Sequence, residues 1–186
     1  SGVPKKVGRV TLSYLLNHKG GVRSEFTVYK AAPQRYYLVS AGAYERHDHD
    51  YLKKAMPRDG SVTFERLTTS MGVLVLAGPR SRDVLAKLTD TDLSNGAFPW
   101  LTGKKMSIGL AQVDALRVNF IGEFGWEIHH PIEMQNYIFD RLMDAGAEFE
   151  IKAETIDEDV TAPRKPVRIG INLSKPAVAA VISLKI

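Results

Sequence analysis

Two glutamates stand close to glycines, in positions where a carboxylate could meet a ligand. Glu25 follows the pair Gly20-Gly21 in the stretch "GGVRSEF", and Glu127 closes the stretch "GEFGWE". An ionised carboxylate can act as a general base, and it can also accept two parallel hydrogen bonds from a ring with adjacent N–H groups. Both glutamates are therefore candidate site acids. The alternative is an ordinary exposed strand residue at Glu25 and a solvated turn acid at Glu127.

The residues around the second glutamate alternate in character. On a strand, Glu127 and His129 share one face while Trp126 and Ile128 share the other. One side can then pack into a core while the opposite side meets a ligand. The glycines before it allow the backbone to approach a flat ring closely.

The stretch Tyr36-Tyr37-Leu38-Val39 also alternates, so Tyr37 and Val39 lie on the same side of their strand. Two explanations fit such a pair. It packs into a core with one ring at the surface, or it forms part of the wall of a binding site.

The run His47-Asp48-His49-Asp50 contains imidazoles and carboxylates, which both bind zinc or iron. Its surroundings have helical spacing, and on a helix residues two apart point away from each other. His47 and His49 therefore could not bind one ion from the same helix face. We predict a solvated helix face here and no metal site.

Composition excludes several further classes of function. The 186 residues include no cysteine, which excludes disulfides, thiolate zinc sites and cysteine nucleophiles. The stretch "GVLVLAGPR" lacks the Gly-Lys-Ser/Thr ending of a phosphate-binding P-loop, and the chain has no Gly-x-Ser-x-Gly elbow. The formal charge of +4 favours anionic partners, but the aromatic residues do not interleave with basic ones as nucleic-acid binding would require. No apolar run is long enough to span a membrane, and the absence of cysteine fits a cytoplasmic or mitochondrial matrix location.

The elements that must carry these residues alternate between strands and helices. Runs rich in β-branched and aromatic residues predict strands at 7–16, 22–29, 36–40, 61–67, 72–76 and 126–129, with a hairpin region at 106–120. Helical spacing predicts helices over 44–56, from near Ser81, and from Pro131 to Gly146. Because most connections are short, we predict an α+β fold with mixed, mainly antiparallel sheets and flanking helices.

The length fits one ordinary domain or two small ones. Beyond Lys152 the composition changes to an acidic stretch and three prolines, and only 178–186 resembles a further strand. We predict a domain over 7–150, followed by a tail or part of a further domain over 151–186.

Five stretches, read in order, resemble the folate-binding aminomethyltransferase family. They are "LSYLLNHKGGVRSEFTV", "RYYLVSAGAYERHDHDYL", "GVLVLAGPRSRDVLAKLTDTDLS", "FPW" and "LRVNFIGEFGWEIHHP". The resemblance keeps order and spacing over about residues 7–150, and it is closest to the C-terminal folate-binding halves of dimethylglycine and sarcosine dehydrogenases. It implies an α+β domain that encloses tetrahydrofolate together with companion domains.

The resemblance also implies roles for individual residues. The family's catalytic acid falls on Glu25, and its folate-binding residues fall on Leu12, Tyr37, Val39 and Glu127. The aminomethyltransferases of glycine cleavage have aspartate where this chain has Glu25, whereas the dimethylglycine dehydrogenase branch is similar to this chain in using glutamate. The family completes its folate pocket with a later arginine. Arg164 and Arg168 follow in this chain, but the residues around them do not support either as its equivalent.

The implied reaction takes a one-carbon unit from a small N-methyl amine, such as dimethylglycine or sarcosine, and gives 5,10-methylenetetrahydrofolate. The chain has no dinucleotide-binding glycine fingerprint, so FAD-dependent oxidation would need a separate FAD-binding domain or subunit. The alternative is a catalytically silent folate-binding-like or regulatory module, and the sequence leaves both open.

Overall fold

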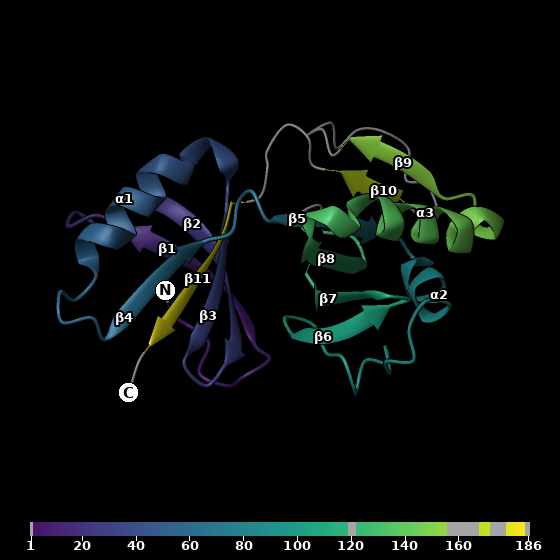
Figure 1. Ribbon diagram of the computed structural model, residues 1–186, viewed down its shortest axis with the longest axis horizontal. Coiled ribbons are helices and arrows are strands. Elements are labelled where there is room, and N and C mark those ends of the chain that lie inside the picture. Colours follow the sequence, from purple (N-terminus) through teal and green to yellow (C-terminus); the bar gives the residue numbers. More distant parts are fainter. Residues whose placement is uncertain (1, 119–121, 156–167, 172–177, 185–186) are drawn as a thin grey trace. The chain divides into compact units, whose positions relative to one another are not determined.

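The computed structural model describes residues 2–118, 122–155, 168–171 and 178–184, with residues 154–155, 168–171 and 178–184 described by their backbone alone. Contacts between Cα atoms divide the chain into two compact units (Figure 1). Unit 1 comprises Ser1–Thr69 and Lys175–Ile186, and unit 2 comprises Ser70–Ser174. Both units combine a sheet with helices, which confirms the predicted α+β class. The domain boundary at residue 150 stays a prediction.

Unit 1 is a five-stranded antiparallel sheet with one helix. Its elements are β1 (Val10–Leu16), β2 (Val22–Ala32), β3 (Arg35–Ser40), α1 (Glu45–Ala55), β4 (Val62–Arg66) and β11 (Val178–Leu184), in the sheet order β1-β2-β3-β11-β4. A 3₁₀ turn, Gly42–Tyr44, precedes α1. One face of the sheet packs beneath the helix, where Leu52 contacts the buried side chains of Phe26, Val28 and Leu38.

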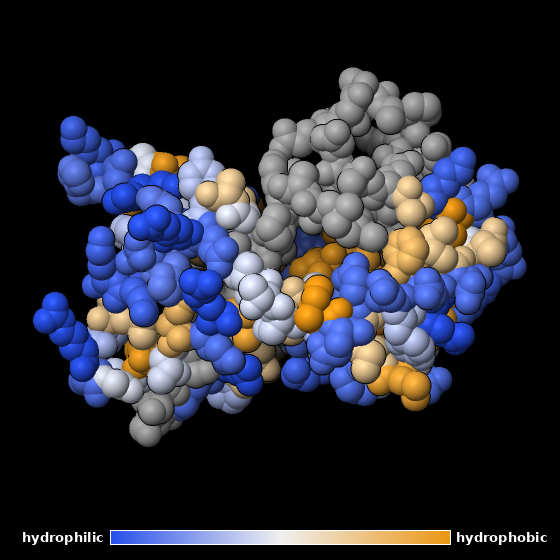
Figure 2. Space-filling view, turned by 45° about the horizontal axis from the view of Figure 1, so that its top comes forward, coloured by the Kyte–Doolittle hydropathy of each residue, from blue (hydrophilic) through white to orange (hydrophobic). Residues whose placement is uncertain are grey.

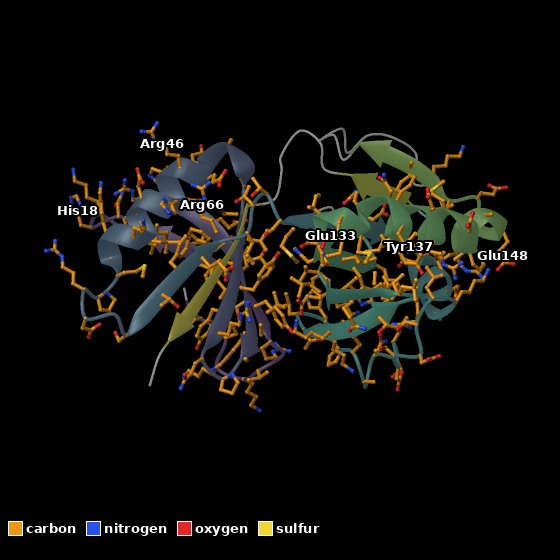
Figure 3. The ribbon with its side chains drawn as sticks, viewed as in Figure 1. His18, Arg46, Arg66, Glu133, Tyr137 and Glu148 are labelled. Atoms are coloured by element: carbon orange, nitrogen blue, oxygen red, sulfur yellow. The ribbon has the colours of Figure 1, made fainter. Side chains whose placement is uncertain are left out.

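The ends of α1 follow from local chemistry. Met56 is extended, because the residue before a proline is pushed out of the helical region, and Pro57 follows it. At the other end, Glu45 lies 3.5 Å from Arg66 of β4, which is labelled in Figure 3. Glu45 also accepts a hydrogen bond from Thr68 at 2.9 Å. The outer surface of α1 is mostly hydrophilic (Figure 2), as expected for a helix that buries only one face.

Unit 2 is a six-stranded sheet with two helices. Its elements are β5 (Met71–Ala77), α2 (Ser81–Ala86), β6 (Gly103–Ile108), β7 (Ala111–Leu116), β8 (Gly125–Pro131), α3 (Gln135–Gly146), β9 (Lys152–Thr155) and β10 (Arg168–Ile171). The sheet order is β6-β7-β8-β5-β10-β9, and all neighbours are antiparallel except the parallel pair β9 and β10.

The core of unit 2 lies between one face of this sheet and the two helices. Trp126 and Ile128 of β8 are fully buried there, together with Ile138 and Leu142 of α3. Burial of each such side chain stabilises the fold by roughly 1.5–3 kcal/mol. Tyr137, labelled in Figure 3, packs against the same core, and its hydroxyl accepts a hydrogen bond from the backbone N–H of Leu110 at 3.1 Å.

Helix α3 ends at Gly146 as predicted, and a 3₁₀ turn, Ile132–Met134, separates its start from Pro131. A Cβ atom at Gly146 would lie 2.6 Å from the side chain of Ile151, so close packing requires the glycine. The strands β9 and β10 were not predicted. Residues 119 and 120 of the predicted hairpin region 106–120 lie outside the described residues, and the hairpin itself is formed by β6 and β7.

Candidate functional site

Four of the five predicted site residues share one face of the unit 1 sheet. In the strand register, Leu12 of β1 and Val39 of β3 both lie opposite Thr27 of β2. Residues directly opposite each other on antiparallel strands project to the same face, and so do residues two apart on one strand. Tyr37 therefore joins Val39, and Glu25 joins Thr27. This face is opposite to the one that α1 covers, and we call it the open face.

The open face changes from buried to exposed along the strands. Tyr37 is buried, whereas Leu12 and Glu25 are exposed. Exposed apolar side chains lie on the same face near Glu25, namely Tyr14 and Leu16 of β1 and Val22 of β2. The arrangement offers an apolar surface beside the Glu25 carboxylate, which suits a flat ring that carries polar groups.

A β-bulge determines which face Glu25 occupies. Leu15 pairs with Ser24, but the next residue, Leu16, pairs with Val22, so Arg23 is an extra, unpaired residue on β2. Without it, the period-2 alternation would turn Glu25 to the face beneath α1. The bulge instead keeps Glu25 on the open face.

The extra residue has its own contacts on the α1 side. The Arg23 guanidinium lies 5.2 Å from the ring centroid of Tyr51, and its Nη2 lies 3.3 Å from Nε2 of His47. His47 in turn lies 3.1 Å from Asp48 through Nδ1. A neutral imidazole satisfies both contacts, since it donates from Nδ1 to the carboxylate and accepts at Nε2 from the guanidinium.

The turn before the bulge is fixed by Asn17. Its side-chain oxygen accepts hydrogen bonds from the backbone N–H groups of Lys19 at 2.8 Å and Gly21 at 3.0 Å. Gly20 has φ of +80°, in the left-handed region that favours glycine. The glycine pair therefore serves the turn geometry.

Tyr14 is a neighbour of Glu25 that sequence reasoning did not identify. The two residues are directly opposite each other on β1 and β2. A hydrogen bond to the Glu25 carboxylate, and the charge of that carboxylate, raise the pKa of the Tyr14 hydroxyl. A regular hairpin from the same turn would place Ser24 opposite Tyr14. The pairing of Tyr14 with Glu25 can therefore be predicted from the sequence only if the bulge is known.

Glu127, the fifth predicted residue, lies on β8 in unit 2. Trp126 and Ile128 are in the core as predicted, so Glu127 and His129 project from the other face of the sheet. The carboxylate Oε2 of Glu127 lies 3.3 Å from Nε2 of His129, which is fully buried. Glu127 keeps 17% of its side-chain surface exposed, enough for a ligand to reach a carboxylate held by its neighbour.

Polar groups extend from this pair onto the adjacent strand. Asp114 of β7 is directly opposite His129, and Lys105 of β6 lies 3.2 Å from Asp114. The side chains of Glu127, His129, Asp114 and Lys105 thus share one face of the unit 2 sheet. Glu25 and Glu127 belong to different units, and their convergence on one ligand stays a prediction.

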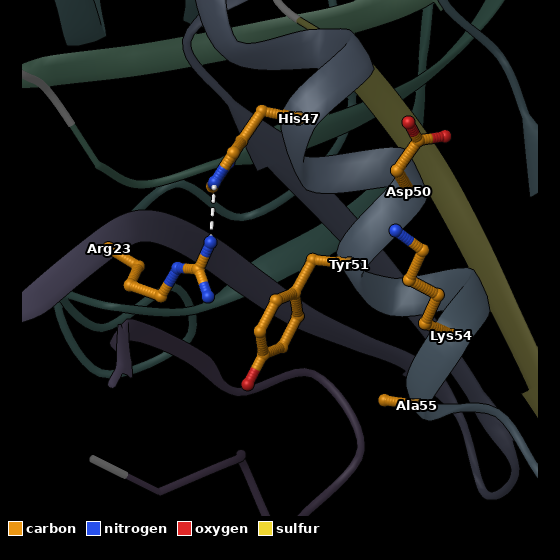
Figure 4. A pocket seen from close by; sticks show the side chains of 6 residues that line it. All are labelled: Arg23, His47, Asp50, Tyr51, Lys54 and Ala55. Carbon is orange, nitrogen blue, oxygen red and sulfur yellow. Dashed lines mark hydrogen bonds between the residues drawn. The ribbon is translucent and has the colours of Figure 1, made fainter. Parts of the chain in front are cut away.

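A cavity of unit 1 lies at a different place. It has a volume of about 510 Å³ beside α1 (Figure 4) and is lined by Arg23, His47, Asp50, Tyr51, Lys54 and Ala55. None of the predicted site residues lines it, and it lies on the α1 side of the sheet. We therefore place the candidate site on the open face and not in this cavity.

The His-Asp run on α1 partly departs from the predicted solvated face. Asp48 is buried, at 2% exposure, while His47 points to Arg23 and His49 packs edge-on against Phe64 at 5.3 Å between ring centroids. The two imidazoles therefore point apart, as the helical spacing requires. Within the described residues no group of three potential ligands is placed to hold a metal ion.

The structure describes no side chain for either Arg164 or Arg168, the two arginines that follow the domain in sequence. Arg164 lies outside the described residues, and Arg168 is described only by its backbone in β10. In the part of the chain that the structure describes, no helix is both long and apolar enough to cross a membrane.

Comparison with known proteins shows the family of the chain. The family model of the GCVT N-terminal domain matches residues 1–157. The chain belongs to the GCVT N-terminal domain family. For this GCVT domain, the predicted relation to aminomethyltransferases is therefore confirmed. The match lies in the N-terminal region of this chain, and its predicted position in a C-terminal half of the dehydrogenases stays a prediction.

Individual relatives of the GCVT domain include two dehydrogenases. It is 38% identical over 149 residues to "Dimethylglycine dehydrogenase, mitochondrial" of Mus musculus, and the aligned region covers 80% of this chain. It is 32% identical over 160 residues to "Sarcosine dehydrogenase, mitochondrial" of Homo sapiens, which covers 78%. It is also 27% identical over 147 residues to "Pyruvate dehydrogenase phosphatase regulatory subunit, mitochondrial" of Mus musculus, again over 78%. The matched region spans only 17% of the length of each of these relatives.

A solved structure has a similar fold. It is "Heterotetrameric Sarcosine Oxidase from Corynebacterium sp. U-96 in complex with pyrrole 2-carboxylate", with a TM-score of 0.62 and 24% sequence identity. The match covers 83% of the GCVT domain chain and 71% of the solved chain. At this identity the likeness supports the α+β fold alone.

Proposed function

We propose that this GCVT domain binds tetrahydrofolate and passes to it a one-carbon unit from an N-methyl amine such as dimethylglycine or sarcosine, giving 5,10-methylenetetrahydrofolate. The observation that carries the proposal is the gathering of Leu12, Glu25, Tyr37 and Val39 on the open face of unit 1. The similarity to dimethylglycine and sarcosine dehydrogenases indicates the class of donor.

The residues of the open face suit this role chemically. Leu12, Tyr37 and Val39 provide an apolar surface for a ring, and Glu25 provides an exposed carboxylate beside it. Tetrahydrofolate supplies the amine nitrogens that take up the carbon. An amine is nucleophilic only after it loses its proton, and a carboxylate next to the reacting nitrogen can accept that proton as a general base.

Glu127 is proposed to recognise the pterin ring. A carboxylate can accept two parallel hydrogen bonds from adjacent N–H groups of a heterocycle. The contact with His129 at 3.3 Å restrains the orientation of Glu127, so that less rotamer freedom is lost when a ligand binds.

The oxidation that releases the one-carbon unit is assigned to another part of the enzyme. The chain spans 17% of the length of its dehydrogenase relatives, and its sequence has no dinucleotide-binding glycine fingerprint. We propose an FAD-binding domain or subunit as the partner. The names of the relatives favour a mitochondrial matrix location over a cytoplasmic one.

A second candidate function is a catalytically silent folate-binding-like or regulatory module. The similarity to a protein named as a phosphatase regulatory subunit favours this candidate. It differs from the first in one measurable property, since a silent module does not accelerate carbon transfer even where it binds tetrahydrofolate.

Calorimetric titration of the chain with tetrahydrofolate tests binding. Glu127→Ala is expected to weaken binding at least tenfold, because hydrogen bonds to a charged group contribute roughly 1.5–3 kcal/mol each. Glu133→Ala, at an exposed acid ahead of α3 (Figure 3), is the matched control and should leave affinity unchanged. Unchanged affinity in Glu127→Ala would refute the assignment of Glu127.

Formation of 5,10-methylenetetrahydrofolate from formaldehyde and tetrahydrofolate tests catalysis without the flavin domain. Glu25→Gln is expected to lower the rate above background by about 10²–10⁴-fold while affinity is retained. Binding of tetrahydrofolate without any acceleration by the unmodified chain would favour the silent module.

A further inference from the structure

The side chain of Glu25 needs a partner if it is to act at a fixed place. It is exposed at the open face, and a glutamate side chain in water samples many rotamers. A general base must lie within hydrogen-bond reach of the proton that it takes, so a mobile carboxylate is in place only part of the time.

Tyr14 meets the geometric requirements of such a partner. It is directly opposite Glu25 across β1 and β2, where the Cβ atoms of paired residues lie about 4.5–5.5 Å apart. A phenol hydroxyl can donate to a carboxylate, and a hydrogen bond to Glu25, with the charge of that carboxylate, raises the pKa of Tyr14.

Two other features fix this pair in position. The bulge at Arg23 places Glu25 opposite Tyr14, and the contacts of Arg23 with Tyr51 and His47 of α1 hold the bulge. Leu12 and Leu16 flank Tyr14 on the same face of β1, so the aromatic ring stands between two apolar side chains.

We propose that Tyr14 is a positioning residue that holds the Glu25 carboxylate at the open face through a hydrogen bond. This proposal rests on the proposed function of Glu25 as general base. Tyr14 donates its hydroxyl hydrogen to the carboxylate and itself exchanges no proton with substrate. Its removal should therefore lower the rate of carbon transfer while the affinity for tetrahydrofolate changes little.

The contact itself is tested without reference to activity. In NMR spectra of the chain with ¹³C-labelled tyrosine, the signal lost in Tyr14→Phe identifies Tyr14. Its titration midpoint should lie above the ordinary tyrosine value of about 10 and should fall towards that value in Glu25→Gln. Equal midpoints in the two proteins would overturn the contact and with it the proposal.

The positioning role is tested with formaldehyde and tetrahydrofolate as substrates. Tyr14→Phe should lower kcat by roughly tenfold or more, the effect of one hydrogen bond to a charged group, with KM for tetrahydrofolate nearly unchanged. In the Glu25→Gln background the same change should have no further effect, because the group to be positioned is gone. Tyr44→Phe, at an exposed tyrosine before α1, is the control and should match the unmodified chain.

The outcomes separate the two levels of inference. An unchanged kcat in Tyr14→Phe, with Glu25→Gln still impaired, overturns the role of Tyr14 and leaves the proposed function intact. An unchanged rate in Glu25→Gln overturns the general-base role and the positioning role together. In that case the NMR titration still reports whether the two side chains touch.

Discussion

Gly125 gives a sharp test of how β8 presents Glu127. In the unit 2 sheet Gly125 pairs with Ala77 of β5, and a Cβ atom added to it would lie 2.1 Å from the carbonyl oxygen of Leu76 and 2.9 Å from the Cα of Ala77. Both are backbone atoms, which cannot rotate away as a flexible side chain can. Gly125→Ala must therefore move one strand relative to the other by roughly 1 Å to restore ordinary contact.

The cost follows from what such a movement disturbs. Trp126, the next residue, is fully buried between Phe98 and Phe124, with ring centroids 6.1 and 5.1 Å away. Overpacking of a close-packed core costs about 1–3 kcal/mol, and each weakened ladder hydrogen bond adds about 1 kcal/mol. We expect Gly125→Ala to lower the free energy of unfolding by about 3 kcal/mol. The entropy effect of Gly→Ala has the opposite sign and is below about 1 kcal/mol.

Urea denaturation followed by tryptophan fluorescence measures this free energy. Both tryptophans of the chain, Trp100 and Trp126, are in unit 2, so the signal reports on that unit. Gly96→Ala is the matched control, because a Cβ atom at Gly96 would have no neighbour within 4 Å. Its stability should be unchanged or slightly higher. If Gly125→Ala behaved like this control, the close approach of β5 and β8 would be refuted.

Two further predictions concern the histidines of β8. Burial lowers the pKa of His130, whose Nδ1 lies 2.9 Å from the carbonyl oxygen of Ile128 and whose Nε2 lies 2.7 Å from Oε1 of Gln135. As pH falls below about 6.5, the histidine takes up a proton only in the unfolded chain. The free energy of unfolding should therefore decrease from pH 7.5 to 5.5, by at most about 1.4 kcal/mol per pH unit. In urea titrations at both pH values, His130→Asn should show a smaller decrease. An equal decrease in both proteins would contradict this. His129→Asn, which removes the contact with Glu127, should weaken tetrahydrofolate binding about fivefold by calorimetry, the effect of losing about one hydrogen bond, and unchanged affinity would show that Glu127 needs no such support.

Period-2 alternation made part of the site predictable. It assigned Trp126 and Ile128 to a core, which their place in the core cluster confirms, and Glu127 and His129 to the other face, where His129 is fully buried as well. The same pattern placed Tyr37 and Val39 on one side of β3. Such inferences succeed because the side-chain direction within one strand depends only on sequence spacing.

Pairing between strands was harder to predict. One extra residue, Arg23, changes the partner of Tyr14 from Ser24 to Glu25 and reverses the face that Glu25 occupies. The types of these residues do not predict the bulge, because Arg23 makes its contacts with α1, more than twenty positions later in the sequence. The strands β9 and β10 were missed for a related reason. They have four residues each and are defined by their partners in the sheet more than by their own composition.

The position of β11 also affects how the chain reaches its final state. This strand lies between β3 and β4, although more than a hundred residues separate it from either in sequence. During synthesis, the inner edges of β3 and β4 therefore stay without their shared neighbour until residues 178–184 have left the ribosome. Unpaired edges of this kind attract other strands. Unit 1 begins before unit 2 in the sequence and is completed only after it, so unit 1 is the more exposed to misassembly in the meantime.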